Sequence, residues 1–185
     1  MKDPEEVIDQ LSHPEALSIL RALANENEGL AQRIAGIARD SLSEVDPGEV
    51  ADALCAELDA LEVEEVWDRA GRTRYGYVEP YEAAYDMVQE VLEPFLDDLR
   101  KSQKLGLSKA VTQLCTGLLK GLYRFERESK SEFKDWAADA PVSFAAEVVK
   151  AWRAGGPNHA SVAALELFIA EELDGWAKNI HLETH

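Results

Sequence analysis

Apolar residues recur every three or four positions along almost the whole chain, and this helical period constrains the fold more than any other feature. No alternating run of β-branched residues reaches the length of a strand. The periodic segments are 14–26, 28–43, 47–61, 80–100, 107–127, 141–153 and 159–179. The sequence therefore predicts an all-α fold of about seven to nine helices.

Proline and its neighbours mark the ends of these segments. Asp3-Pro4-Glu5-Glu6 and Asp46-Pro47-Gly48-Glu49 each place an N-cap Asp before a first-turn proline and a Glu. The connections are short, so consecutive helices are expected to form antiparallel hairpins. We expect one domain over residues 1–185, which divides into sub-units 1–70 and 79–180 if the 71–78 loop separates them.

One pattern occurs twice. The spacing of Asp, Pro, Glu, Val, Asp and Leu in residues 3–11 returns in residues 46–54. A helical repeat explains this echo, and so does convergence on good capping chemistry. Hairpin length and periodicity over most of residues 14–179 resemble α-solenoids of the HEAT or TPR type. Residues 67–80 are similar to helical microbial proteins of unknown function. The resemblance implies hairpins stacked as a short α-solenoid, with an irregular helical bundle as the alternative.

The formal net charge of −17 excludes a general affinity for the phosphates of nucleic acids. Adaptation to high salt is another source of such an acidic balance. No apolar run is long enough to span a membrane, and the acidic N-terminus lacks the features of a secretory signal. We therefore expect a cytoplasmic protein without membrane contact. Cys55 and Cys115 lie in apolar helical patterns, so both are expected to be buried, reduced thiols.

A basic segment interrupts this acidic chain. Residues 100–134 carry nine bases and three acids, and several of these bases share one face of the predicted helix 107–127. They either balance the charge of the acidic helices or form a docking surface for an acidic protein, including a second copy of this chain. The candidate binding residues on this face are Lys109, Lys120, Arg124 and Arg127.

The loop that follows residue 68 combines arginine, tyrosine and glycine. Arginine makes bidentate contacts with anions, and both arginine and tyrosine are enriched at protein interaction hot spots. In the alternative interpretation, the arginines pair with Glu62, Glu64, Glu65 and Glu79, and the tyrosines cover the core. The candidate binding residues of the loop are Arg69, Arg72, Arg74, Tyr75 and Tyr77.

Six carboxylates line one face of the predicted helix 80–100. The E-x-x-E steps at Glu79/Glu82 and Glu90/Glu93 resemble the helical Mg²⁺ sites of MazG-like nucleotide pyrophosphohydrolases. The resemblance implies a Mg²⁺-dependent hydrolase with these four glutamates as ligands. The apolar stripe on the opposite side of the same helix favours a solvent-exposed acidic face instead.

Two smaller patterns complete the set. The step Gly117-x-x-x-Gly121 predicts close packing of a neighbouring helix. His181 and His185 have a spacing that suits Zn²⁺, but a third ligand is missing and the metalloprotease Glu does not follow the first His. We expect no cofactor. The sequence predicts a non-catalytic interaction or scaffold module that binds a protein partner or itself, with the Mg²⁺-dependent hydrolase as the alternative.

Overall fold

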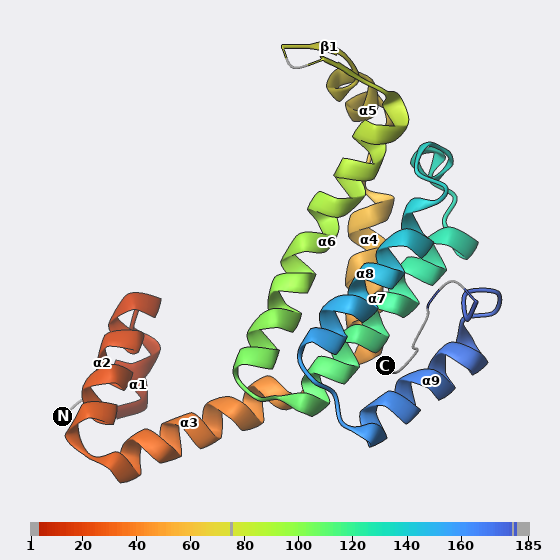
Figure 1. The fold of residues 1–185 in the computed structure, drawn as a ribbon. Coiled ribbons are helices and arrows are strands. Elements are labelled where there is room, and N and C mark those ends of the chain that lie inside the picture. The colour runs from red at the N-terminus through yellow and green to blue at the C-terminus, as the bar shows by residue number, and fades with distance from the viewer. Residues whose placement is uncertain (1–3, 75, 179, 181–185) are drawn as a thin grey trace. The chain divides into compact units, whose positions relative to one another are not determined.

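The computed structural model describes residues 4–74, 76–178 and 180. They form nine α-helices, so the predicted all-α class is confirmed (Figure 1). The helices are α1 (Pro4–Asp9), α2 (His13–Glu26), α3 (Glu28–Ser43), α4 (Pro47–Asp59), α5 (Val63–Arg69), α6 (Pro80–Lys104), α7 (Ser108–Glu128), α8 (Ala140–Ala154) and α9 (His159–Glu172). Between α7 and α8 lies a 3-10 helix, η1 (Glu132–Trp136).

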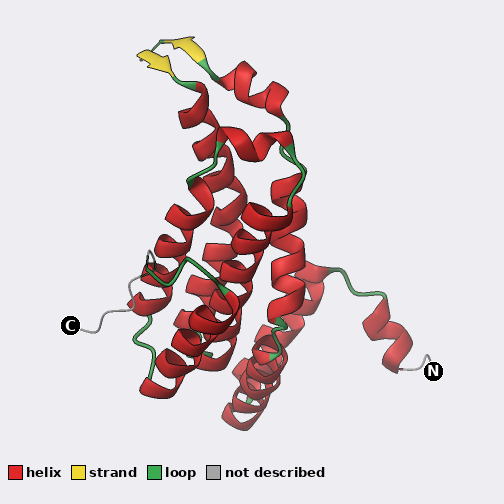
Figure 2. Ribbon diagram, turned by 90° about the vertical axis from the view of Figure 1, so that its right-hand side faces the viewer, coloured by secondary structure: helices red, strands yellow, loops and turns green. Residues whose placement is uncertain are grey.

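A short β-hairpin connects α5 to α6 where a loop was expected (Figure 2). Strands β1 (Gly71–Thr73) and β2 (Gly76–Val78) are antiparallel, with Gly71 opposite Val78 and Arg72 opposite Tyr77. Gly71 has a φ of 107° and Gly76 a φ of 143°, values that only glycine adopts without strain. The two glycines therefore allow the chain to form this hairpin. Its strands are too short for the alternation of side chains to have predicted them from the sequence.

The chain forms two compact units, residues 1–43 and residues 44–185. In the larger unit, α7 packs against α4, α6, α8 and α9, and its interface with α4 is the most extensive. In a solenoid each hairpin contacts only its neighbours along the chain. The arrangement around α7 is therefore an irregular helical bundle, the second of the two expected forms.

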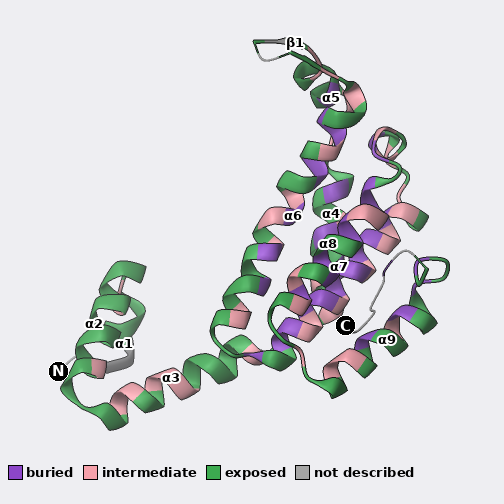
Figure 3. Cartoon of the chain, viewed as in Figure 1, coloured by how far each residue is buried: buried purple, intermediate pink, exposed green. Residues whose placement is uncertain are grey.

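The core of the larger unit is apolar throughout. Figure 3 shows its buried residues concentrated on α4, α6, α7 and α8. Among the described residues no buried side chain is polar or charged. The largest fully buried side chains include Trp152, Phe125, Phe133, Phe144, Leu54, Leu58 and Met87.

Glycine sets the distance between α4 and α7. A Cβ added to Gly117 would lie 2.7 Å from Cβ of Val50 and 2.8 Å from the carbonyl oxygen of Pro47. A Cβ on Gly121 would lie 3.1 Å from the carbonyl oxygen of Ala51. The predicted close approach of a helix to this glycine step is confirmed, and the partner helix is α4.

The helix starts marked at Asp3-Pro4 and Asp46-Pro47 are both confirmed, because α1 begins at Pro4 and α4 begins at Pro47. The side chain of Asp46 accepts a hydrogen bond from the amide of Gly48 at the start of α4. At the start of α6, the carboxylate of Glu82 accepts from the amide of Glu79 at 3.0 Å. The Asp-Pro echo begins a helix at Pro4 and at Pro47, but α1 has 6 residues and α4 has 13. The echo thus corresponds to a shared way of starting a helix, and the two helices differ beyond their first turns.

The last predicted helix is shorter than expected, because α9 ends at Glu172 where 159–179 was predicted. Gly175 has a φ of 84°, which interrupts helical geometry. Leu173, Trp176 and Ile180 are nevertheless buried. The indole Nε1–H of Trp176 donates to Oε2 of Glu126 on α7 at 3.0 Å. Leu173 and Trp176 contribute to the core from outside the helix, so their helical spacing correctly marked burial but not conformation, and Ile180 is buried just beyond the predicted segment.

The smaller unit contains α1, α2 and α3, and none of its described residues is buried. The apolar stripes predicted for 14–26 and 28–43 do not form a core within this unit. Leu17 and Leu20 are 48% and 45% exposed, and Ile37 is 62% exposed. Helix α3 runs away from α2 beyond their junction, so the two helices touch each other over a limited length (Figure 1).

Candidate functional site

An open groove of about 500 Å³ lies on the larger unit, between α6 and the segment formed by α4 and α5. One part of its lining is apolar and the other part is charged. The apolar residues are Leu61, Met87, Val91, Pro94 and Phe95, and the charged residues are Glu57, Arg69, Glu90 and Asp98.

Helix α6 supplies most of this lining because its residues recur at intervals of three or four. Met87, Val91, Pro94 and Asp98 follow one another at these intervals and share a face of the helix. Pro94 lies inside α6 and has no amide hydrogen. The backbone carbonyl of Glu90 therefore lacks the donor that a helix normally supplies from position i+4. Glu90 itself is one of the residues that line the groove.

The single cation of the groove is engaged by an acid of the same groove. Nη1 of Arg69 lies 2.8 Å from Oε2 of Glu90, and Nη2 lies 3.9 Å from Oε2 of Glu65. Glu57 and Asp98 form no ion pair with any described residue and are exposed. The groove thus combines an apolar wall with two unpaired carboxylates, and it favours a ligand that is both apolar and cationic.

The β-hairpin next to α5 presents an aromatic and a cationic side chain together. Arg72 and Tyr77 lie directly opposite each other in the ladder, so their side chains share one face of the hairpin. Both are exposed, and Tyr77 is 63% exposed. Tyr77 therefore does not cover the core, although that was one of the expected roles. Arg74 is also exposed, and Tyr75 lies outside the described residues.

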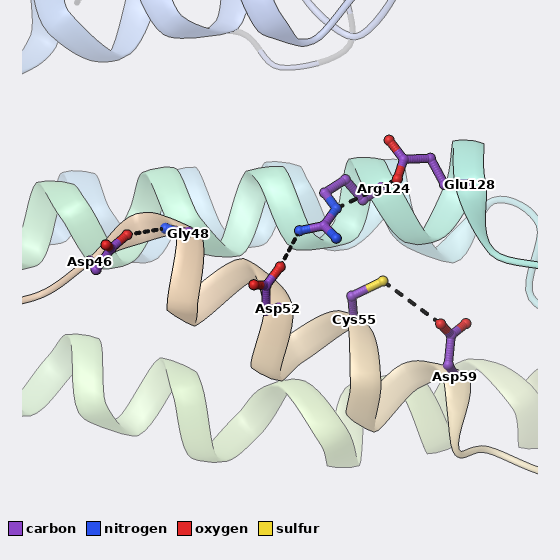
Figure 4. Close-up of polar contacts among 7 residues, drawn as sticks. All are labelled: Asp46, Gly48, Asp52, Cys55, Asp59, Arg124 and Glu128. Atoms are coloured by element: carbon purple, nitrogen blue, oxygen red, sulfur yellow. Dashed lines mark hydrogen bonds and ion pairs between the residues drawn. The ribbon is translucent and has the colours of Figure 1, made fainter.

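The predicted basic face of α7 is partly used inside the bundle (Figure 4). Arg124 forms an ion pair with Asp52 of α4 and lies 3.7 Å from Glu128. Arg127 lies 3.2 Å from Glu126, donates to the carbonyl of Asp174 at 3.3 Å and stacks over the ring of Tyr123. Both arginines join α7 to other parts of the larger unit. Lys109 and Lys120 make no ion pair with any described residue, and their docking role stays a prediction.

The four glutamates of the predicted Mg²⁺ site are used in other contacts of the described structure. Glu82 caps the start of α6, Glu90 pairs with Arg69, and Oε1 of Glu93 lies 2.6 Å from Nη1 of Arg100. Glu79 is the exposed N-cap residue. Within the described ranges, no group of three or more His, Cys, Asp or Glu side chains is close enough to hold a metal ion. His181 and His185 lie outside these ranges.

The two predicted thiols differ in their surroundings. Cys115 on α7 is fully buried, as expected. Cys55 on α4 is only partly buried, and its thiol lies 3.9 Å from Oδ2 of Asp59 (Figure 4). Burial raises the pKa of both thiols, and the charge of Asp59 raises that of Cys55 further. Neither environment activates a cysteine for nucleophilic chemistry.

Sequence reasoning did not find the groove. It treated Glu90 as part of a solvent face and Arg69 as part of a loop, whereas the fold brings the two side chains together. The one available signal was Pro94, a proline inside an otherwise regular helical period, because an internal proline removes one backbone hydrogen bond of the helix.

The protein is therefore an all-α helical bundle, and its open groove has both apolar and acidic lining residues. No helix in the described part of the chain has both the length and the apolar character needed to cross a bilayer. Comparison with known family models, with curated proteins and with solved structures finds no match to this chain.

Proposed function

We propose that this protein is an interaction module whose groove, lined by α4, α5 and α6, binds a segment of a protein partner without catalysing a reaction. The partner segment presents apolar side chains beside lysine or arginine. The observation that supports this choice is the pairing of an apolar wall with the unpaired carboxylates of Glu57 and Asp98.

The shape of the groove favours a chain segment over a small molecule. Small-molecule sites enclose most of the surface of their ligand. This groove has a suitable volume but is open to solvent. An open channel beside a helix suits an extended or helical segment, which leaves one of its own faces in solvent.

The charges of the groove favour a basic segment. Arg69 is already paired with Glu90, so an incoming acidic side chain would meet Glu57 and Asp98 without a free cation to offset them. An incoming lysine or arginine would gain these two carboxylates and the carbonyl of Glu90. Each such contact is charge-assisted and stronger than one between neutral groups.

The hairpin extends this surface. Arg72 and Tyr77 are residue types enriched at interaction hot spots, and they lie side by side on an exposed ladder that follows directly after Arg69 and Ala70. We expect the hairpin to contact the same partner beyond the end of the groove. Because Arg72 is cationic, this second contact favours an acidic or carbonyl group on the partner.

A selection of displayed random peptides against the full chain tests the proposal. We expect the selected peptides to be enriched in apolar residues next to lysine or arginine. The double variant Glu57→Lys with Asp98→Lys should reduce their affinity by about tenfold or more, because a close charge pair at an interface contributes on this scale.

The matched control is Glu166→Lys with Glu171→Lys, which makes the same change in net charge on α9. This control should keep most of the affinity. Selection of acidic peptides, an equal loss in the control, or no peptide whose binding depends on the groove would each overturn the proposal.

A further inference from the structure

Arg69 occupies a position in the groove that also suits a cation of a ligand. Among the described residues that line the groove it is the only cation, and it lies at the end of α5. Its Nη1 is 2.8 Å from Oε2 of Glu90, which lines the same groove. Lysine and arginine bind carboxylates through charge-assisted hydrogen bonds of this kind. A basic residue of a bound segment would therefore compete with Arg69 for Glu90.

The backbone of Arg69 is held by the core, whereas its side chain reaches into solvent. Val66, one turn earlier on α5, is fully buried and anchors this short helix. The side chain of Arg69 is 40% exposed and that of Glu90 is 62% exposed. Ion pairs between side chains this exposed contribute little to stability, because water solvates both charges. The contact between Arg69 and Glu90 is thus weak enough to open without disturbing the fold.

A second carboxylate lies within reach of Arg69. Nη2 is 3.9 Å from Oε2 of Glu65, four residues earlier on α5, and Glu65 lies outside the set of described residues that line the groove. Residues four apart are neighbours on a helix surface, so this pair does not depend on Glu90. When a ligand takes Glu90, Arg69 keeps a partner outside the groove. The exchange therefore leaves neither Arg69 nor Glu90 without an opposite charge.

Release of Glu90 would leave a free carboxylate at both ends of an apolar stretch of α6. Glu90 and Asp98 are eight residues apart, which is about 12 Å along the helix axis. Val91, Pro94 and Phe95 lie between them in the sequence of α6 and line the same groove. A segment that matches this wall has an apolar run with a basic residue on either side.

We infer that Arg69 is a displaceable placeholder for one of two basic residues in the bound segment. It pairs with Glu90 while the groove is empty, and it moves to Glu65 when a lysine or arginine of the partner arrives. Arg69 thereby determines specificity, since a segment with a single basic residue at Asp98 gains nothing at Glu90. This inference rests on the proposed function of the groove and narrows the partner to an apolar run bounded by basic residues.

Calorimetric titration of the full chain with synthetic peptides tests this inference. The first peptide is a groove-dependent peptide from the display selection that carries two lysines around an apolar run. Two further peptides replace one lysine or the other by glutamine. We expect Arg69→Met to raise the affinity of the two-lysine peptide by about fivefold, since it removes a competing exposed ion pair. This gain should disappear when one particular lysine is replaced and persist when the other is.

Matched variants separate this effect from net charge. Arg100→Met removes the same charge from α6, where Nη1 of Arg100 lies 2.6 Å from Glu93 and neither residue lines the groove. It should change the affinity much less than Arg69→Met. Glu65→Gln removes the second partner of Arg69 and should lower the affinity of the two-lysine peptide about twofold. Glu64→Gln, on the same helix, should not.

Three results would overturn the placeholder role while the groove remains a binding site. They are equal gains in Arg69→Met and Arg100→Met, a gain that depends on neither lysine, and groove-dependent peptides that all carry one basic residue. The proposed function fails in a different way. If Glu57→Lys with Asp98→Lys leaves peptide binding unchanged, the groove is not the binding site and Arg69 has no part in recognition.

Discussion

Gly117 of α7 lies against Val50 of α4 so closely that a methyl group on its Cα would come within 2.7 Å of the Val50 Cβ. The second close atom is the backbone carbonyl oxygen of Pro47, which cannot rotate away. The distance between the two helices with the most extensive interface in the bundle therefore depends on the absence of one side chain.

We expect Gly117→Ala to destabilise the protein by about 1–2 kcal/mol in urea unfolding, since overpacking exceeds the gain in helix propensity. Gly121→Ala should cost less, because its nearest neighbour would lie at 3.1 Å. Gly36→Ala on α3 is the control, since nothing lies within 4 Å of its added methyl group. Equal effects at Gly117 and Gly36 would contradict the packing argument.

Pro94 should lower the stability of α6, because it removes one backbone hydrogen bond of the helix. We expect Pro94→Ala to raise the free energy of unfolding by about 1–3 kcal/mol, because the new amide can donate to the carbonyl of Glu90. The same variant should weaken the binding of groove-selected peptides, since that carbonyl is no longer available to them. A stabilised variant with unchanged peptide affinity would show that the carbonyl takes no part in binding.

We expect the Arg124–Asp52 ion pair to stabilise the folded protein and to take no part in binding a partner. Both side chains are partly exposed, so we expect a coupling energy of at most about 1 kcal/mol in a double-mutant cycle of Arg124→Met and Asp52→Asn. Lys120→Met is the control and should show no coupling with Asp52→Asn. If Arg124→Met left stability unchanged but removed an association with an acidic protein, the docking role predicted for the basic face would be supported instead.

The two cysteines should react slowly with alkylating reagents at neutral pH. The raised pKa values of Cys55 and Cys115 keep both thiols protonated, and the thiolate is the reactive form. Asp59→Asn should accelerate the alkylation of Cys55, because it removes a charge that opposes ionisation, and should leave Cys115 unreactive in the folded protein. Peptide mapping after timed labelling distinguishes the two sites.

The same pKa shifts give a pH dependence of stability. A thiol whose pKa is higher in the folded protein than in the unfolded chain binds more protons when folded. Its contribution to stability is therefore complete below the ordinary thiol pKa of about 8.5 and is lost as the pH rises further. We expect the free energy of unfolding to fall above that pH, and to fall less steeply in Cys115→Ala relative to its own value at pH 7.

The sequence was informative about helices because its apolar spacing and its capping residues are local properties. Asp46 and Pro47 mark a helix start that the structure contains, and the glycine step at 117 and 121 correctly predicted a close helix contact. It was less informative about sites. The identity of Arg69 gave no means of choosing between Glu65, its neighbour in α5, and Glu90, which lies 21 residues further along the chain.

By itself the sequence determined the all-α class, most helix boundaries and the acidic balance, because hydrogen bonding within helices and capping depend on residues a few positions apart. Only the tertiary structure decided that α7 is the centre of an irregular bundle, that Arg124 is engaged by Asp52, and that an apolar and acidic groove lies beside α6. It also decided that the regular stripes of α2 and α3 are exposed. Periodicity shows that a helix has an apolar face, but which surface covers that face depends on contacts between distant segments, and those are settled by packing.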